Sequence, residues 1–159
     1  MLFGYLAGVT DNLGFSTGVL ILPQRQTVLV AKQAACLDVL CGGHHERTLP
    51  RIAKWGDGWM PNAYPPDQAA LDVFAQLRRL TEQAGRDPAK VGIEVWVSMG
   101  TGTEADWTKE ARFWKQAGAS YLCLTTTFNR RHHKRIPGHT MGDHLGALRR
   151  YHSAVADLL

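Results

Sequence analysis

The densest group of reactive side chains in this chain of 159 residues is a basic run that spans residues 130–135. Its members are Arg130, Arg131, His132, His133, Lys134 and Arg135. Four cations placed this closely could hold an anionic group, and the alternative is a basic loop that contacts only water. Without these four, the other 14 of the 18 Lys and Arg residues balance the 14 Asp and Glu residues. The net charge of +4 therefore reflects one local patch.

Other reactive groupings in the sequence carry weaker signals. His132, His133, His139 and His144 do not have the spacing of a helical HExxH motif or of a zinc finger, so a metal site is not expected. No aromatic residue alternates with the charges of the basic run, and no nucleic-acid-binding motif surrounds it, so no nucleic-acid partner is expected. The sequence also contains no Walker loop and no GxGxxG motif.

These residues must be positioned by strands and helices that alternate along the chain. Strands are expected at 14–22, 57–60, 91–99 and 121–126, and helices at 28–40, 50–55, 67–84, 103–117 and 143–158. The helix at 28–40 should end at Gly42 and Gly43, since glycine commonly ends helices. Repeated strand–helix alternation predicts an α/β fold with a parallel sheet, in which the basic run follows the last strand.

Two segments are specific enough to predict which side chains are buried. Apolar residues at 70, 73, 74, 77, 80 and 84 lie on one face of the helix at 67–84. In the strand at 91–99, Ile93, Val95 and Val97 alternate with polar residues that include Glu94 and Ser98, so the two faces should meet different surroundings.

The composition limits the location of the protein. Cys36, Cys41 and Cys123 are an odd number without a CxxC pair, which is typical of reduced thiols in a cytoplasmic protein. The apolar start MLFGYLAGV is too short to span a bilayer and has no basic region or cleavage site, so no membrane association is expected.

Several phrases of the chain resemble the luciferase-like monooxygenase family of flavin- and deazaflavin-dependent oxidoreductases. FSTGVLILPQRQTVLVAKQAACLDVLCGG (15–43) is similar to the third β/α unit of that family, and TLPRIAKWGDGWMP (48–61) to a much later segment. YLCLTTT (121–127) and HLGALRRY (144–151) match more loosely. The resemblance implies a partial (β/α)8 TIM barrel of the bacterial-luciferase type, with about four parallel strands, flanking helices and one domain over residues 1–159. Two non-contiguous family segments would join near 43–47, with roughly a hundred residues of a typical ~250-residue barrel absent there and the first two strands also missing.

The resemblance also implies a cofactor, either coenzyme F-420 (a deazaflavin) or FMN. In the family, the position of Thr17, Gly18 and Val19 lies behind the isoalloxazine ring; the alternative is a glycine that relieves crowding in a strand. Trp59 belongs to a family phrase and could contact the cofactor or pack in the core. Loops after the last two barrel strands often bind phosphate, so Arg130 and Arg131 could hold a cofactor phosphate or an anionic tail. Glu94 and Ser98 could face the barrel lumen, although an ion pair or simple exposure is the alternative.

The expected activity is hydride transfer or monooxygenation on a small organic substrate, and no catalytic residue can be named. The alternatives are a non-catalytic remnant or oligomerising scaffold of the family, and an anion-binding module built on the basic run. Four strands cannot close a barrel that needs eight, so the former lumen face should expose apolar side chains from every strand. A homodimer that covers this face is expected.

Overall fold

The computed structural model describes residues 40–42, 48–61 and 64–158. The predicted strand at 14–22, with Thr17, Gly18 and Val19, lies outside the described residues, as does the predicted helix up to residue 39. The described helical segments are α3 (Thr48–Trp55), α4 (Gln68–Gln83), η2 (Pro88–Lys90), α5 (Glu104–Ala117), α6 (Met141–Val155) and η3 (Ala156–Leu158).

Four strands form a parallel sheet whose spatial order follows the chain. They are β1 (Leu40–Gly42), β2 (Gly58–Met60), β3 (Gly92–Ser98) and β4 (Tyr121–Thr125). Helices flank the three strands β2, β3 and β4, and β1 and β4 are the outer strands of the described sheet, so the sheet is not closed into a barrel. The prediction of an α/β fold with parallel strands is confirmed.

The first described strand corrects one sequence-based boundary. Leu40, the predicted last residue of a helix, is extended, and Leu40–Gly42 pairs with Gly58–Met60. Glycine is a poor helix former, and backbone pairing with β2 satisfies the hydrogen-bonding groups of this segment. The neighbour of β2 in the described sheet is therefore Leu40–Gly42, a segment in which no strand was expected.

Helix ends follow the local signals in the sequence closely. Thr103 caps α5 through a capping box with Asp106, and Thr140 caps α6 through a second box with Asp143. Asp67 caps α4 by accepting a hydrogen bond from the Ala70 N–H at 3.2 Å. Helix α6 begins two residues before the expected Asp143, because the cap is formed by Thr140.

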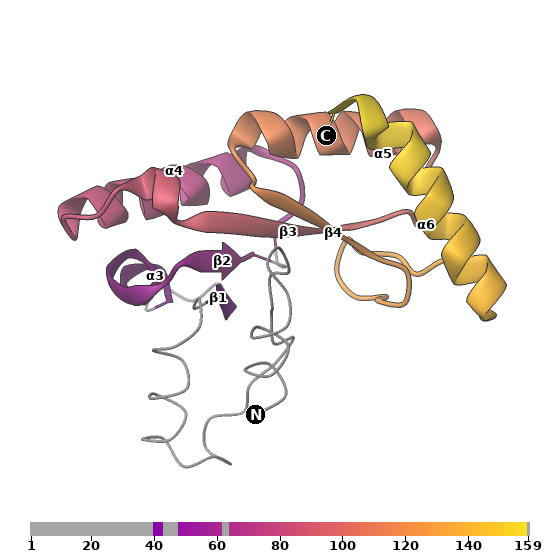
Figure 1. The fold of residues 1–159 in the computed structure, drawn as a ribbon, viewed down its shortest axis with the longest axis horizontal. Helices are drawn as coiled ribbons and strands as arrows, with labels where there is room; N and C mark the ends of the chain where they lie inside the picture. Colours follow the sequence, from indigo (N-terminus) through magenta and orange to yellow (C-terminus); the bar gives the residue numbers. More distant parts are fainter. Residues whose placement is uncertain (1–39, 43–47, 62–63, 159) are drawn as a thin grey trace, which may run out of the picture.

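The core lies between the sheet and the helices that cover one of its faces, among them α4 and α5 (Figure 1). Ile93, Val95 and Val97 of β3 are buried against these helices, as the alternation predicted. The buried face of α5 carries Trp107, Ala111, Trp114 and Ala117. On α4 the buried residues are Ala70, Phe74, Leu77 and Thr81. Val73 and Leu80 of the expected apolar stripe are partly buried, whereas Ala84 is exposed, so the stripe ends earlier than expected and includes a polar residue.

The second face of the sheet differs from the expected apolar lumen surface. From β3 it carries Glu94, Trp96 and Ser98, which are all half-buried. The register pairs Glu94 with Tyr121, Trp96 with Cys123 and Ser98 with Thr125, so these partners from β4 lie on the same face. The face is therefore a mixture of polar and apolar side chains. Trp96 of β3 is half-buried and Tyr121 of β4 is exposed, so both strands present an apolar ring there, as expected, but polar residues lie between them.

Candidate functional site

The loop after β4 folds back over the end of the sheet at which the strands finish. Its backbone is held by the Lys134 N–H, which donates to Ser98 Oγ at 3.0 Å, and by the Ile136 N–H, which donates to the Thr126 carbonyl at 3.0 Å. The Phe128 N–H donates to Thr125 Oγ1 at 3.3 Å. Because Ser98 and Thr125 are the last residues of β3 and β4, these contacts place the basic run at the carboxyl edge of the sheet. Functional sites of parallel α/β folds lie at this edge.

Four ring side chains form a cluster that joins this loop to β3, which we call the histidine–aromatic cluster: Trp96 of β3 and Phe128, His132 and His133 of the loop. The rings of Trp96 and Phe128 meet edge to face with 5.4 Å between their centroids. His133 lies 5.8 Å from Phe128 and 4.0 Å from His132 by the same measure, and its side chain is buried. The basic run therefore turns its histidines toward the sheet.

The environment of His132 favours the neutral imidazole. Partial burial first, and then the neighbouring His133 and Arg131, lower the pKa of His132 from 6.5 to about 4, against the opposing effect of Asp67. His132 is therefore uncharged near pH 7. Its Nε2 atom and the Nε1 atom of Trp96 are buried and have no hydrogen-bond partner in the structure. Such groups carry a desolvation cost of about 1–3 kcal/mol each, which a ligand with matching polar atoms would offset.

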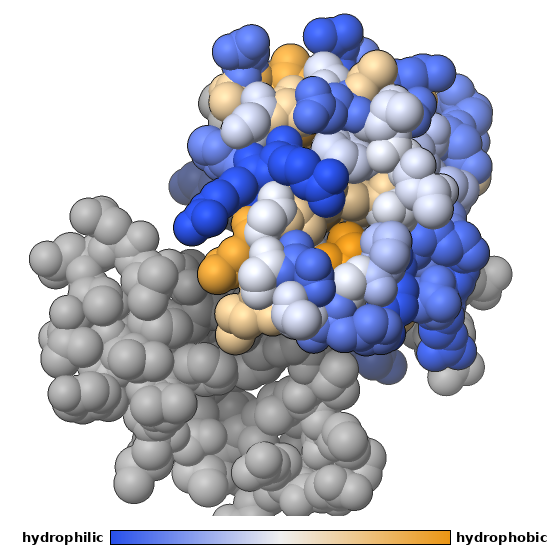
Figure 2. Space-filling model, turned by 90° about the vertical axis from the view of Figure 1, so that its right-hand side faces the viewer, coloured by the Kyte–Doolittle hydropathy of each residue, from blue (hydrophilic) through white to orange (hydrophobic). Residues whose placement is uncertain are grey.

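The cations of the basic run differ in their exposure. Arg130, Arg131 and Lys134 are exposed. Arg135 is half-buried and donates to the Ile136 carbonyl at 3.3 Å, and its Nη2 atom lies 2.8 Å from His139 Nδ1. From the side of the molecule where α6 lies, the described surface is mostly hydrophilic, with a few hydrophobic residues between (Figure 2). Four cations on one loop, three of them exposed, could hold an anion, and the alternative of a loop that contacts only water stays open.

The remaining predicted site residues lie elsewhere. Trp59 is 0% exposed and stacks edge to face with Phe74 of α4 at 5.8 Å, so it lies in the helix-side core, as the packing interpretation expected. Its direct contact with a cofactor stays a prediction. Ser98 Oγ accepts the Lys134 N–H, and Glu94 lies beside Cys123. Burial first, and then the charge of Glu94, raise the pKa of the Cys123 thiol, which is not in a disulfide.

Sequence inspection missed the histidine–aromatic cluster. The alternation in β3 placed Trp96 on the non-helical face, but Phe128 and the histidines are brought to it only by the return of the loop. No group of three or more possible metal ligands occurs in the described part of the chain. Among the same residues, no helix is both long and apolar enough to cross a bilayer.

Comparison with known proteins adds no family to this description. No protein-family model matches the chain, and no curated protein matches it. The resemblance to luciferase-like oxidoreductases therefore stays a prediction that rests on the residues quoted above.

Proposed function

We propose that the carboxyl edge of the sheet binds a flat, anionic redox cofactor of the deazaflavin or flavin class, coenzyme F-420 or FMN. The observation that carries the proposal is that the exposed cations Arg130, Arg131 and Lys134 belong to the same loop as Phe128, His132 and His133 of the histidine–aromatic cluster. A flavin-type cofactor combines a flat heteroaromatic ring, which needs apolar and hydrogen-bonding surface, with a phosphate-bearing chain, which needs cations.

The residues at this edge fit such a group in two respects. Trp96 Nε1 offers a hydrogen-bond donor, and His132 Nε2 offers a donor or an acceptor according to the tautomer; both are buried without a partner in the structure. The cations Arg130, Arg131 and Lys134 are exposed residues of the same loop. The cofactor supplies hydride chemistry toward a small organic substrate in proteins of this class, and the chain's own residues would bind and orient it.

The finding that the sheet is not closed favours a second candidate function. The described part of the chain forms an open sheet of four strands, which is half of the number that encloses a TIM-barrel site. A non-catalytic remnant or an oligomerising scaffold of the luciferase-like family would keep the sheet and lose the cofactor.

Titration of the protein with reduced F-420 and with FMN, followed by fluorescence, separates the two functions. We expect a micromolar Kd for one of them, and this Kd should rise as salt is added because phosphate contacts are screened. Folded protein that binds neither compound would overturn the cofactor proposal and leave the scaffold. Inorganic phosphate that protects the fold without cofactor binding would instead favour a simple anion site.

A matched pair of variants tests the basic run itself. Arg130, Arg131 and Lys134 are changed together to Gln, and Arg135 is kept because it hydrogen-bonds to the loop backbone. Each exposed charge contributes about 1 kcal/mol or less, so the triple variant should bind at most about a hundredfold more weakly and lose its salt dependence. The control changes the exposed Arg112, Arg149 and Arg150 of α5 and α6 to Gln, which removes the same charge and should preserve binding.

A further inference from the structure

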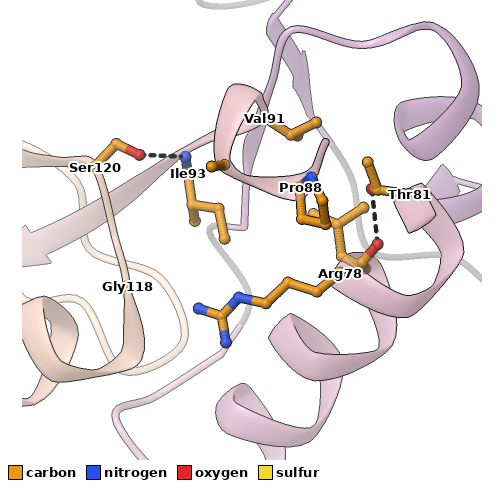
Figure 3. A pocket seen from close by; sticks show the side chains of 9 residues that line it. Arg78, Thr81, Pro88, Val91, Ile93, Gly118 and Ser120 are labelled. Carbon is orange, nitrogen blue, oxygen red and sulfur yellow. Dashed lines mark hydrogen bonds between the residues drawn. The ribbon is translucent and has the colours of Figure 1, made fainter. Parts of the chain in front are cut away.

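A pocket of about 320 Å³ opens at the opposite, amino edge of the sheet (Figure 3). It lies where β3 begins, between the second half of α4, the short helix η2 and the turn that joins α5 to β4. Its volume is at the lower end of the range for small-molecule sites. It is separate from the histidine–aromatic cluster, which lies at the ends of the same strands.

One wall of the pocket is apolar and rigid. Leu77 of α4, Val91 and Ile93 line it, and all three belong to the hydrophobic core. Their side chains are held by the packing of α4 on β3, so the wall exists before any ligand arrives. A hydrocarbon group placed against it would be removed from water at about 25 cal/mol per Å² of apolar surface.

The polar side chains that line the pocket are Thr81, Ser120 and Arg78, and some of their hydrogen-bond donors are not used within the described part of the protein. Thr81 Oγ1 donates to the Leu77 carbonyl at 2.8 Å and is satisfied by its own helix. Ser120 Oγ accepts the Ile93 N–H at 3.1 Å, which leaves the hydroxyl proton available to donate. Figure 3 shows the Arg78 guanidinium extended toward the turn at Gly118, with Ser120 on the other side of Ile93.

Arg78 is the one charged residue that lines the pocket. Its Nη2 atom donates to the Ala117 carbonyl at the end of α5, which also offsets the negative end of that helix. No carboxylate pairs with Arg78 in the described structure, where the single ion pair is Arg86 with Asp57. A guanidinium has five N–H groups, so most of them remain for a ligand.

We propose that this pocket binds a small organic carboxylate. The carboxylate would lie on the remaining N–H groups of Arg78, and the hydrocarbon part would lie against Leu77, Val91 and Ile93. A bidentate guanidinium–carboxylate contact beside an apolar wall selects an anion with a hydrophobic body over either inorganic anions or neutral apolar molecules.

The test uses the whole chain and 4-phenylbutyrate as the probe, with 4-phenylbutanamide as its neutral isostere. Binding is followed by the amide shifts in two-dimensional NMR spectra. We expect saturable shifts centred on Val91, Ile93 and Ser120, and at least tenfold weaker binding of the amide. No saturable shift at 10 mM probe, shifts centred elsewhere, or equal binding of the two compounds would overturn the proposal.

Neighbouring arginines on α4 supply the control. Arg78→Gln should weaken 4-phenylbutyrate binding at least tenfold, whereas Arg79→Gln, which removes the same charge from an exposed residue outside the pocket, should change it less than twofold. Equal effects of the two variants would mean a general charge effect and would contradict a site at Arg78. If Arg78→Gln does not fold, the comparison of 4-phenylbutyrate with its amide on the unmodified chain still shows whether the pocket prefers the carboxylate.

Discussion

At the scale of single residues, the most informative group is His132, because its environment sets its protonation. Its pKa of about 4 lies below the usual value of 6.5. A histidine with a lowered folded-state pKa binds fewer protons in the native state than in the unfolded state. The native state is therefore favoured above pH 6.5, and this contribution is lost as the pH falls through about 4.

His132→Asn should consequently flatten the pH dependence of stability between pH 6.5 and 4. The measurement is the urea midpoint of the unfolding transition at several pH values, supported by an NMR titration of the imidazole. His152→Gln, at an exposed residue of α6, serves as the control and should retain the parental slope. An unchanged slope in His132→Asn would show that His132 titrates normally in the folded protein.

At the scale of elements, two glycines with opposite environments test how the helices end. Gly118 ends α5 with a φ of 89°, in the left-handed region, and a Cβ there would collide with the Arg78 guanidinium. Gly146 lies inside α6 and a Cβ there would meet no atom within 4 Å. A Cβ atom at position 118 is thus opposed both by the backbone conformation and by the Arg78 side chain. At position 146 neither a neighbouring atom nor the helical backbone opposes it.

Gly118→Ala should therefore destabilise the protein by roughly 1–2 kcal/mol, because an L residue is strained at this φ. Gly146→Ala should stabilise it by about 1 kcal/mol, since alanine is the better helix former. Chemical denaturation of both variants gives the two changes. Equal signs for the two would contradict the described helix end.

The capping boxes give a second prediction at this scale. Thr103→Ala removes the acceptor for the Asp106 N–H and should lower the free energy of unfolding by about 1 kcal/mol. Thr101→Ala, at an exposed residue two positions earlier, should change it little. If Thr101→Ala lowers the free energy of unfolding as much as Thr103→Ala does, the effect comes from the loop and not from the cap.

At the scale of the whole molecule, the open sheet raises the question of assembly. The described sheet ends at β1 and β4, and an outer strand of a sheet can pair with a strand of another chain. Helix α6 adds exposed apolar residues at helical spacing, Met141, Leu145 and Leu148. Both features agree with a homodimer. The second face of the sheet mixes polar and apolar side chains, so a wholly apolar face is no longer a reason to expect one.

We expect light scattering to give about twice the chain mass of 17.6 kDa. Leu145→Glu and Leu148→Glu together should dissociate the dimer if α6 forms the contact, and should leave it intact if the sheet edges do. A monodisperse parent of 17.6 kDa would rule out assembly by either surface.

The local features of the fold were determined by the sequence itself. The alternation of Ile93, Val95 and Val97, the cap at Thr103 and the glycine at 118 act through neighbouring residues, so their signals survive without tertiary context. The parallel direction of the strands also followed, because strand–helix alternation favours a parallel sheet.

Features that depend on distant contacts were decided only by the tertiary structure. The extension of Leu40–Gly42 results from pairing with β2, and Trp59 is buried because α4 packs over it. The histidine–aromatic cluster joins β3 to a loop more than thirty residues later, and the amino-edge pocket joins Arg78 to Ser120. No local pattern encodes such pairs, because their free energy comes from burial that exists only after the helices have docked on the sheet.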